Sequence, residues 1–384
     1  MPQATIRNAE QLKPEVIRND MIETLTQLDY IQMGGETDGD TTYASAASEF
    51  PLVNMDDPDE AYYTHNIVAG RMQPTAHDAE SPLGSINLPE KEVYTTDSYK
   101  EKIRPDKGLR SRFKRSPYSV AAAITLKFQI KTWVTREQVT WRGDEVIDGL
   151  IGMEGQTKHP DLPDDHDVTV ANPWSDSTNA EPYRNITNAV ARTVDNGVAG
   201  GNSAPVPNLY GSPRTLRDLK QTADMEDRLA GVRIKSLDTG TLEEIIDEEL
   251  GEIRRVRVNV PRENANGEMI DEDGNVVDEA KNAAMDNALE PWDPDMNSGA
   301  GGNRRCVVIG RPGTGSAFMP WFLEDLLDYQ KDVPPSGEMA VDDEMGFFTQ
   351  RWSNNDPVGT TIKTGQEVGF HLMRPENWHV LRGV

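Results

Sequence analysis

Histidine and aspartate side chains gather where the middle of the chain becomes rich in proline and acid. Imidazole and carboxylate groups are the ligands that zinc takes in proteins, so this stretch could hold a metal ion. A flexible acidic linker in an acidic protein would have the same composition, and we interpret the stretch as a linker at a domain boundary. The residues concerned are His159, Asp161, Asp164, Asp165, His166 and Asp167.

Two other stretches contain part of an ion-binding pattern. Residues 310–316 read Gly-Arg-Pro-Gly-Thr-Gly-Ser, and glycines before a serine could cradle a phosphate. The Walker lysine is missing, however, and Pro312 removes an amide donor, so a tight loop explains the residues better. Residues 271–275 resemble half of a calcium loop but lack the glutamate at loop position 12, which leaves a turn.

Residue types that could catalyse a reaction are not grouped in the sequence. The single cysteine, Cys306, opens the apolar run Cys-Val-Val-Ile, which predicts a buried structural thiol. Six histidines are scattered, and the sequence contains no evident nucleophile–base pair or pair of carboxylates in an apolar setting. We therefore predict that the chain is not an enzyme and that it uses no metal or other cofactor.

A basic segment stands out at residues 99–115, where eight Lys and Arg residues face only two acidic ones and the net charge is +6. A solvated loop and a contact with DNA phosphate are two interpretations. We favour an arm that lies across an acidic neighbouring subunit, because unlike charges fix register and aid encounter. The predicted contact residues are Lys100, Lys102, Arg104, Lys107, Arg110, Arg112, Lys114 and Arg115.

The rest of the chain is strongly acidic, with a net charge of −26 over 384 residues. This charge argues against non-specific nucleic-acid binding over the whole surface. Only fourteen of the 39 basic residues are lysines, and the hydrophobic share is 36%, which together favour a halophilic source. No apolar run approaches the ~20 residues that span a bilayer, and the N-terminus lacks a signal-peptide core, so we expect assembly in a cytoplasm without membrane contact.

The element that would organise these residues is predicted at positions 120–155. Residues 120–134 alternate between apolar and polar side chains, which predicts an unusually long strand with one buried face. Thr135 and Gln138 then form a capping-box pattern, which predicts that a helix starts there. Gly143 lies inside that pattern and could kink or restart the helix. The apolar stripe of the helix would contain Val139, Val146, Ile147, Leu150 and Ile151.

Elements on either side of this unit complete the outline. An N-terminal helix over residues 10–31 would have one apolar face, formed by Leu12, Val16, Ile22 and Leu25. A second domain would follow the linker, with helices that start at Pro182 and Pro213. Residues 264–302 are polar and rich in Gly, Asn and Asp, which predicts an insertion or surface loop. Residues 358–370 and 378–381 alternate as closing strands.

In this order of parts the chain resembles the major capsid proteins of tailed double-stranded DNA viruses, which have the Hong Kong 97-type fold. Residues 99–115 are similar to the returning limb of the family's extended loop, and residues 135–155 to its spine helix. Residues 174–229 resemble the axial domain, with a Trp, a Pro-started helix, a Pro-Asn strand and another helix. Residues 369–383 resemble the closing strand, Arg-Pro turn and strand. The 264–302 insertion departs from a minimal member.

The resemblance implies an α+β fold in five parts. They are an N-terminal arm (1–60), an extended loop with adjoining strands (61–117), a peripheral domain with long strand and spine helix (118–165), an axial domain (166–340) and closing strands (341–384).

The resemblance also implies self-assembly into hexamers and pentamers of an icosahedral shell around viral DNA. The partners would be further copies of the chain, a portal, and decoration or scaffolding proteins. Together with the resemblance, the acidic composition predicts a virus with a haloarchaeal host. An encapsulin-like cargo shell and a halophilic soluble enzyme are the alternatives.

Overall fold

The computed structural model describes the chain in separate stretches, and the structural statements below refer to these alone. They are residues 43–44, 49–55, 61–64, 90–93, 95–105, 120–143, 146–152, 159–199, 207–211, 213–229, 253–256, 306–311, 316–321, 338–342, 346–355 and 358–384.

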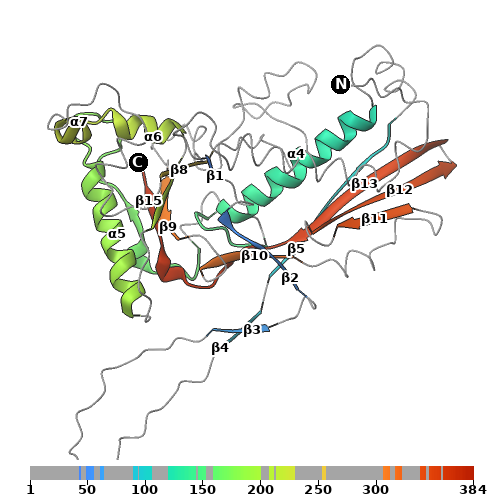
Figure 1. The fold of residues 1–384 in the computed structure, drawn as a ribbon, viewed down its shortest axis with the longest axis horizontal. Helices are drawn as coiled ribbons and strands as arrows, with labels where there is room; N and C mark the ends of the chain where they lie inside the picture. The colour runs from blue at the N-terminus through green and yellow to red at the C-terminus, as the bar shows by residue number, and fades with distance from the viewer. Residues whose placement is uncertain are drawn as a thin grey trace, which may run out of the picture.

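A seven-stranded sheet forms one half of the molecule. Its strands follow the order β11-β12-β13-β10-β14, while β2 pairs with β10 and β5 pairs with β13. The antiparallel hairpin of β12 and β13 extends furthest from the middle of the molecule (Figure 1). The strand predicted over residues 358–370 is confirmed as β13, which ends two residues earlier. The seven strands are β2 (Leu52–Asn54), β5 (Asp97–Ile103), β10 (Ala317–Trp321), β11 (Glu338–Asp342), β12 (Phe347–Asn355), β13 (Val358–Val368) and β14 (His371–Leu372).

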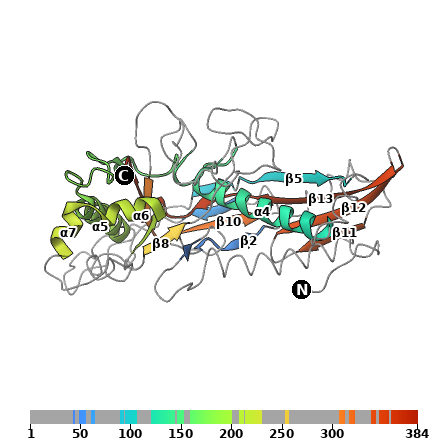
Figure 2. The same ribbon diagram turned by 90° about the horizontal axis from the view of Figure 1, so that it is seen from above.

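A single long helix, α4 (Val120–Trp141), lies along this sheet and contacts β5 and β13 (Figures 1 and 2). The prediction of a long strand over residues 120–134 is therefore wrong. The three alanines at 121–123 favour a helix, and the buried side chains recur every four residues, which is a helical spacing. These side chains are Ile124, Phe128, Thr132, Arg136 and Thr140.

The predicted helix start at Thr135 is also wrong, because Thr135 lies inside α4. Its hydroxyl donates a hydrogen bond to the Lys131 carbonyl oxygen at 2.8 Å, one turn back, rather than capping a helix start. The helix ends two residues before Gly143, whose φ of +73° suits a residue that follows a helix. Gly143 thus stops the helix instead of kinking it.

The predicted spine stripe is divided between α4 and the segment after it. Val139 lies on α4 and is buried. Ile147, Leu150 and Ile151 are buried too, but they lie in irregular chain, and Val146 is 53% exposed. The four buried residues join the main core, so the sequence predicted the burial of all four but the helical structure of Val139 alone.

A six-stranded sheet with three helices forms the other half. Its strand order is β1-β8-β7-β9-β15-β6, and α5 packs on β9 and β15. Pro182 and Pro213 start α5 and α6 as predicted. The strands are β1 (Tyr43–Ala44), β6 (Asp167–Thr169), β7 (Asn208–Gly211), β8 (Ile253–Val256), β9 (Cys306–Gly310) and β15 (Trp378–Arg382), and the helices are α5 (Pro182–Ala199), α6 (Pro213–Lys220) and α7 (Ala223–Leu229).

Four short elements complete the described fold. Strands β3 (Ala61–Thr64) and β4 (Glu90–Val93) form an antiparallel ribbon that belongs to neither large sheet. The 3-10 helix η3 (Asp164–His166) precedes β6, and η6 (Pro375–Asn377) precedes β15. The α+β fold predicted from the sequence is thus confirmed, with helices and mostly antiparallel strands in separate layers.

Aromatic side chains join the two halves. Phe50 meets Trp141 at the end of α4, Phe370 after β13, and Trp378 at the start of β15, with ring centroids 5.2, 5.3 and 5.5 Å apart. All four rings are buried and belong to one core cluster, which contains residues from both large sheets. Aromatic pairs at these distances contribute roughly 0.5–1.5 kcal/mol beyond the burial of their area.

Two smaller expectations concern burial and membranes. Cys306 lies at the start of β9 and is buried, as its apolar run predicted. In the described residues, no helix has the length and apolar character that crossing a bilayer would require.

Candidate subunit-contact surface

The β3–β4 ribbon is the element most clearly separated from the body of the molecule (Figure 1). Its four residue pairs run from Ala61 opposite Val93 to Thr64 opposite Glu90. A two-stranded hairpin alone is marginally stable in water, so a ribbon outside both sheets needs support from further contacts.

The described part of the basic segment lies on β5 and the two residues that follow it. The resemblance predicts that this segment is the returning limb of the extended loop. The returning strand of the ribbon, however, is β4. Strand β5 comes after it and pairs with β13 along its whole length, with Lys102 opposite Lys363. The basic side chains therefore begin where the chain has rejoined the seven-stranded sheet.

Alternation along β5 separates its charges. Lys100, Lys102 and Arg104 are exposed, whereas Tyr99, Glu101 and Ile103 are half-buried. Tyr99 and Ile103 pack on the main core. The three basic side chains thus form an exposed stripe of one sign, which we name the β5 stripe.

Glu101 ties β5 to the helix above it. Its carboxylate lies 3.9 Å from Lys127 Nζ and 3.2 Å from Lys131 Nζ, both on α4. These side chains are 28–40% exposed, so each pair contributes at most about 1 kcal/mol. Their effect is mainly to orient Glu101 toward α4, whereas Lys100 and Lys102, its neighbours along β5, are exposed.

A buried polar network fixes α4 on β13 more firmly. Arg136 Nε donates to Gln366 Oε1 at 2.9 Å, and Gln366 Nε2 donates to the Thr132 carbonyl oxygen at 3.0 Å. Arg136 and Gln366 are each 2% exposed. Because both ends of the Gln366 amide are used, the network sets the position of α4 along the strand.

A second polar link joins the two halves close to the aromatic cluster. Arg382 on β15 donates from Nε to Asp167 Oδ1 and from Nη2 to the Ile151 carbonyl oxygen, both at 2.6 Å. Asp167 lies on β6 and Ile151 in the segment that follows α4. One guanidinium thus holds three chain segments together.

The residues considered for a metal site do not converge. His159 Nδ1 lies 3.8 Å from Asp161 Oδ2, while the His166 ring stacks on His379 with ring centroids 5.4 Å apart. Asp167 binds Arg382 instead. Among the residues that the structure describes, no group of three or more His, Cys, Asp or Glu side chains could hold a metal ion.

Burial controls the protonation of two of these histidines. His379 is fully buried, and burial, assisted by nearby His166 and Arg192, lowers its pKa to about 3 although Asp165 opposes the shift. Burial likewise lowers the pKa of His159 to about 4, against the opposing charge of Asp148. The His159 and His379 rings are therefore both neutral at pH 7. The junction around His379 is densely packed, because His166, whose ring stacks on His379, has its Nδ1 atom 2.7 Å from the Trp378 carbonyl oxygen.

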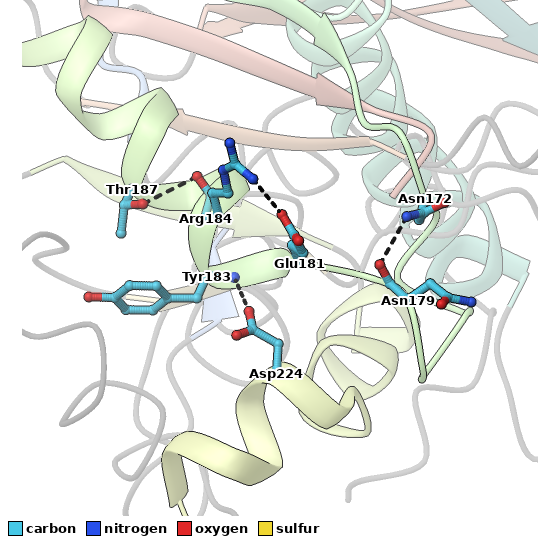
Figure 3. A network of polar contacts seen from close by, with 7 residues as sticks. All are labelled: Asn172, Asn179, Glu181, Tyr183, Arg184, Thr187 and Asp224. Atoms are coloured by element: carbon cyan, nitrogen blue, oxygen red, sulfur yellow. Dashed lines mark hydrogen bonds and ion pairs between the residues drawn. The ribbon is translucent and has the colours of Figure 1, made fainter.

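Polar contacts also order the start of α5 (Figure 3). The Tyr183 amide donates to Asp224 of α7, and Arg184 Nη1 pairs with Glu181 at 3.0 Å. Before the helix, Asn172 Nδ2 donates to the Asn179 carbonyl oxygen. Asp176 accepts hydrogen bonds from Asn179 and Thr178, which lower its pKa. These contacts connect the loop before α5, the first turn of α5 and α7, which together we name the α5 lobe.

Several predicted contact residues lie outside the described residues. They are the N-terminal arm residues Leu12, Val16, Ile22 and Leu25, and Lys107, Arg110, Arg112, Lys114 and Arg115 of the basic segment. The 264–302 insertion also lies there. Of the basic contact residues, the structure describes Lys100, Lys102 and Arg104.

Sequence reasoning missed the residues that fix the architecture. Arg136, Gln366 and Arg382 were not singled out, because each is a polar residue whose partner is more than 200 positions away. Gln366 lies on a strand rich in polar residues, and Arg136 shares its helix face with Thr132 and Thr140, so neither residue stands out in the local sequence.

Comparisons with known proteins give no match by sequence and several by structure. Neither a protein-family model nor a curated protein matches the chain. A phage-related protein from Bordetella bronchiseptica is 12% identical, with 88% of this chain and 90% of that chain covered and a TM-score of 0.48. The capsid of cyanophage P-SCSP1u is 10% identical, with 93% of this chain and 94% of that chain covered and a TM-score of 0.47. An encapsulin complex from Synechococcus elongatus is 10% identical, with 87% of this chain and 85% of that chain covered and a TM-score of 0.42.

Proposed function

We propose that this chain is the major capsid protein of a tailed double-stranded DNA virus, with the Hong Kong 97-type fold, and that it assembles into the hexamers and pentamers of an icosahedral shell. The observation that carries the proposal is the β3–β4 ribbon, which stands outside both sheets and leads directly into the strand with the β5 stripe. A ribbon of this kind acquires stable contacts when neighbouring copies lie against it.

The charge distribution supports the same proposal. The β5 stripe is an exposed basic surface on a chain whose net charge is −26. A neighbouring copy therefore presents a surface of mostly opposite sign, which steers encounter and disfavours incorrect registers. The rigid links through Arg136 and Arg382 would hold the ribbon and the α5 lobe at a fixed distance within each subunit.

Further partners and the host belong to the same proposal. A portal and decoration or scaffolding proteins would complete the particle, and the enclosed DNA would lie near the shell without sequence-specific contact. The acidic composition favours a haloarchaeal host, since ~1 M salt reduces the Debye length to about 3 Å and screens repulsion between subunits.

The test of the proposed contact reverses the β5 stripe. In the variant Lys100→Glu, Lys102→Glu and Arg104→Glu, we expect folded subunits but a loss of most particles, because attraction to the acidic neighbour becomes repulsion. The matched control, Lys100→Arg, Lys102→Arg and Arg104→Lys, keeps every charge and should assemble like the wild type. Particle yield by sedimentation and folding by circular dichroism are the measurements. An unchanged particle yield in the reversed variant would refute a role for the stripe.

A further inference from the structure

Arg311, the residue that follows β9, is a buried cation without a counter-ion among the described residues. Its side chain is 6% exposed, and its Nε and Nη2 atoms have no hydrogen-bond partner there. Burial lowers the pKa of Arg311, as expected when no anion compensates for the lost water. Buried charges in folded proteins are normally paired, because an unpaired one costs several kcal/mol.

A second unsatisfied group belongs to a residue next to the same strand pair. Gly310, the last residue of β9, pairs with Trp378, the first residue of β15, so Arg311 follows one member of the pair and Asn377 precedes the other. Asn377 is 4% exposed, and its Oδ1 atom has no hydrogen-bond partner in the described part of the chain. Its Nδ2 atom contacts Ser316 Oγ at 3.5 Å.

The Asn377 amide can present a donor to the same place. The oxygen and nitrogen of an amide side chain have nearly the same shape, and a hydroxyl both donates and accepts. Turning the amide by half a rotation therefore keeps the contact with Ser316 and directs N–H groups to where Oδ1 now lies. Arg311 and Asn377 would then offer donors together, which suits an anion.

The two chain segments next to these residues both lie against α5. Trp378 lies over Gly310, where a Cβ would collide with its ring, and Trp378 belongs to the main core. Ile309 belongs instead to the cluster under α5. Arg311 directly follows β9, and both β9 and η6, which contains Asn377, pack against α5.

We propose that Arg311, assisted by Asn377, binds an oxyanion. The planar guanidinium presents parallel N–H groups that match the two oxygens of a carboxylate or a phosphate. The ligand would be inorganic phosphate or sulfate, or the carboxylate of a second copy of this chain. Residues 312–315 form no part of the proposed site.

The first arm of the experiment measures thermal unfolding of unassembled full-length subunits during a titration with sodium phosphate, with ionic strength held constant by sodium chloride. A ligand that binds only the folded state raises the midpoint as its concentration exceeds Kd. We expect the wild-type midpoint to rise by a few degrees and that of Arg311→Met to stay flat. Arg184→Met loses the same charge at an exposed position and should respond like the wild type.

The second arm distinguishes the source of the anion. If wild-type subunits do not respond to phosphate but Arg311→Met particles dissociate at a lower urea concentration than Arg184→Met particles, the anion is a carboxylate of a neighbouring copy. Arg311→Lys keeps the positive charge but lacks the parallel N–H groups of the guanidinium, so its response should be weaker than that of the wild type. It replaces Arg311→Met in both arms if that variant does not fold. An equal phosphate response in wild type and Arg311→Met, or no difference in either arm, would overturn the proposal.

Discussion

Arg382 joins three chain segments that lie far apart in the sequence. It binds Asp167 of β6 and the carbonyl oxygen of Ile151, and the Asp167 side chain is only 11% exposed. Removal of the guanidinium would leave a nearly buried carboxylate without its counter-ion, which costs more than the hydrogen bonds alone.

We therefore predict that Arg382→Met lowers the free energy of unfolding by about 2–3 kcal/mol, measured by urea denaturation. The control is Arg184→Met, which removes an ion pair whose side chains are 71% and 59% exposed and should cost about 0.5 kcal/mol or less. Equal losses in the two variants would show that Arg382 has no special role at the junction.

His379 gives the folded state a pH dependence of definite sign. Its pKa is about 3 in the fold against 6.5 in the unfolded chain, so the unfolded state binds the extra proton first as the pH falls. Stability is therefore lost progressively from about pH 6.5 toward pH 3, at up to about 1.4 kcal/mol per pH unit. We predict that the free energy of unfolding, measured by urea denaturation, declines less steeply between pH 6 and pH 4 in His379→Phe than in the wild type. A decline as steep as that of the wild type would contradict it.

At the scale of elements, α4 shows how an alternating pattern can mislead. Ile124 and Phe128 fit a two-residue period and a four-residue period equally well, because four is a multiple of two. The decision depends on residues 121–123, three alanines that favour a helix, and on Arg136 and Thr140, which are polar but buried. Their burial follows from contacts with β13 and β10, which no local pattern contains.

Other elements could be predicted because their signals are local. Pro182 and Pro213 start helices, since proline fixes φ and needs no amide partner in the first turn. Cys306, Val307 and Val308 form a continuous apolar run and become a strand buried on both faces. Of the predicted contact residues on the basic segment, Lys100, Lys102 and Arg104 lie in the described part of the chain and are exposed. The links through Gln366 and Arg382 depend on the tertiary fold, because their partners are distant in the sequence.

Gly143 provides the test of where α4 ends. Its φ is +73°, and a Cβ there would collide with the Ile147 carbonyl oxygen and the Gly149 nitrogen. We predict that Gly143→Ala destabilises the protein by roughly 1–3 kcal/mol in urea denaturation. Gly211→Ala, where the Cβ would first meet the Val307 side chain at 3.1 Å, should cost less. If Gly143→Ala is as stable as the wild type, the helix does not end through this residue.

At the scale of the whole molecule, the two large sheets and α4 share one core around the aromatic cluster of Phe50, Trp141, Phe370 and Trp378. The closing strands connect both halves, because β13 lies in the seven-stranded sheet and β15 in the six-stranded sheet. A shared core of this kind limits movement between the two halves. The proposed subunit would need such a fixed geometry, because its contacts would repeat on a closed lattice.

Electron microscopy of the purified full-length chain in ~2 M salt, where charges are strongly screened, tests the central proposal most directly. We predict closed particles or rings of five and six subunits, which loosen on dialysis to ~0.1 M salt as acidic repulsion returns. Absorbance ratios of the particles then separate a shell around nucleic acid from one around protein cargo. A discrete monomer or dimer in molar salt, with neither rings nor shells, would contradict the proposal.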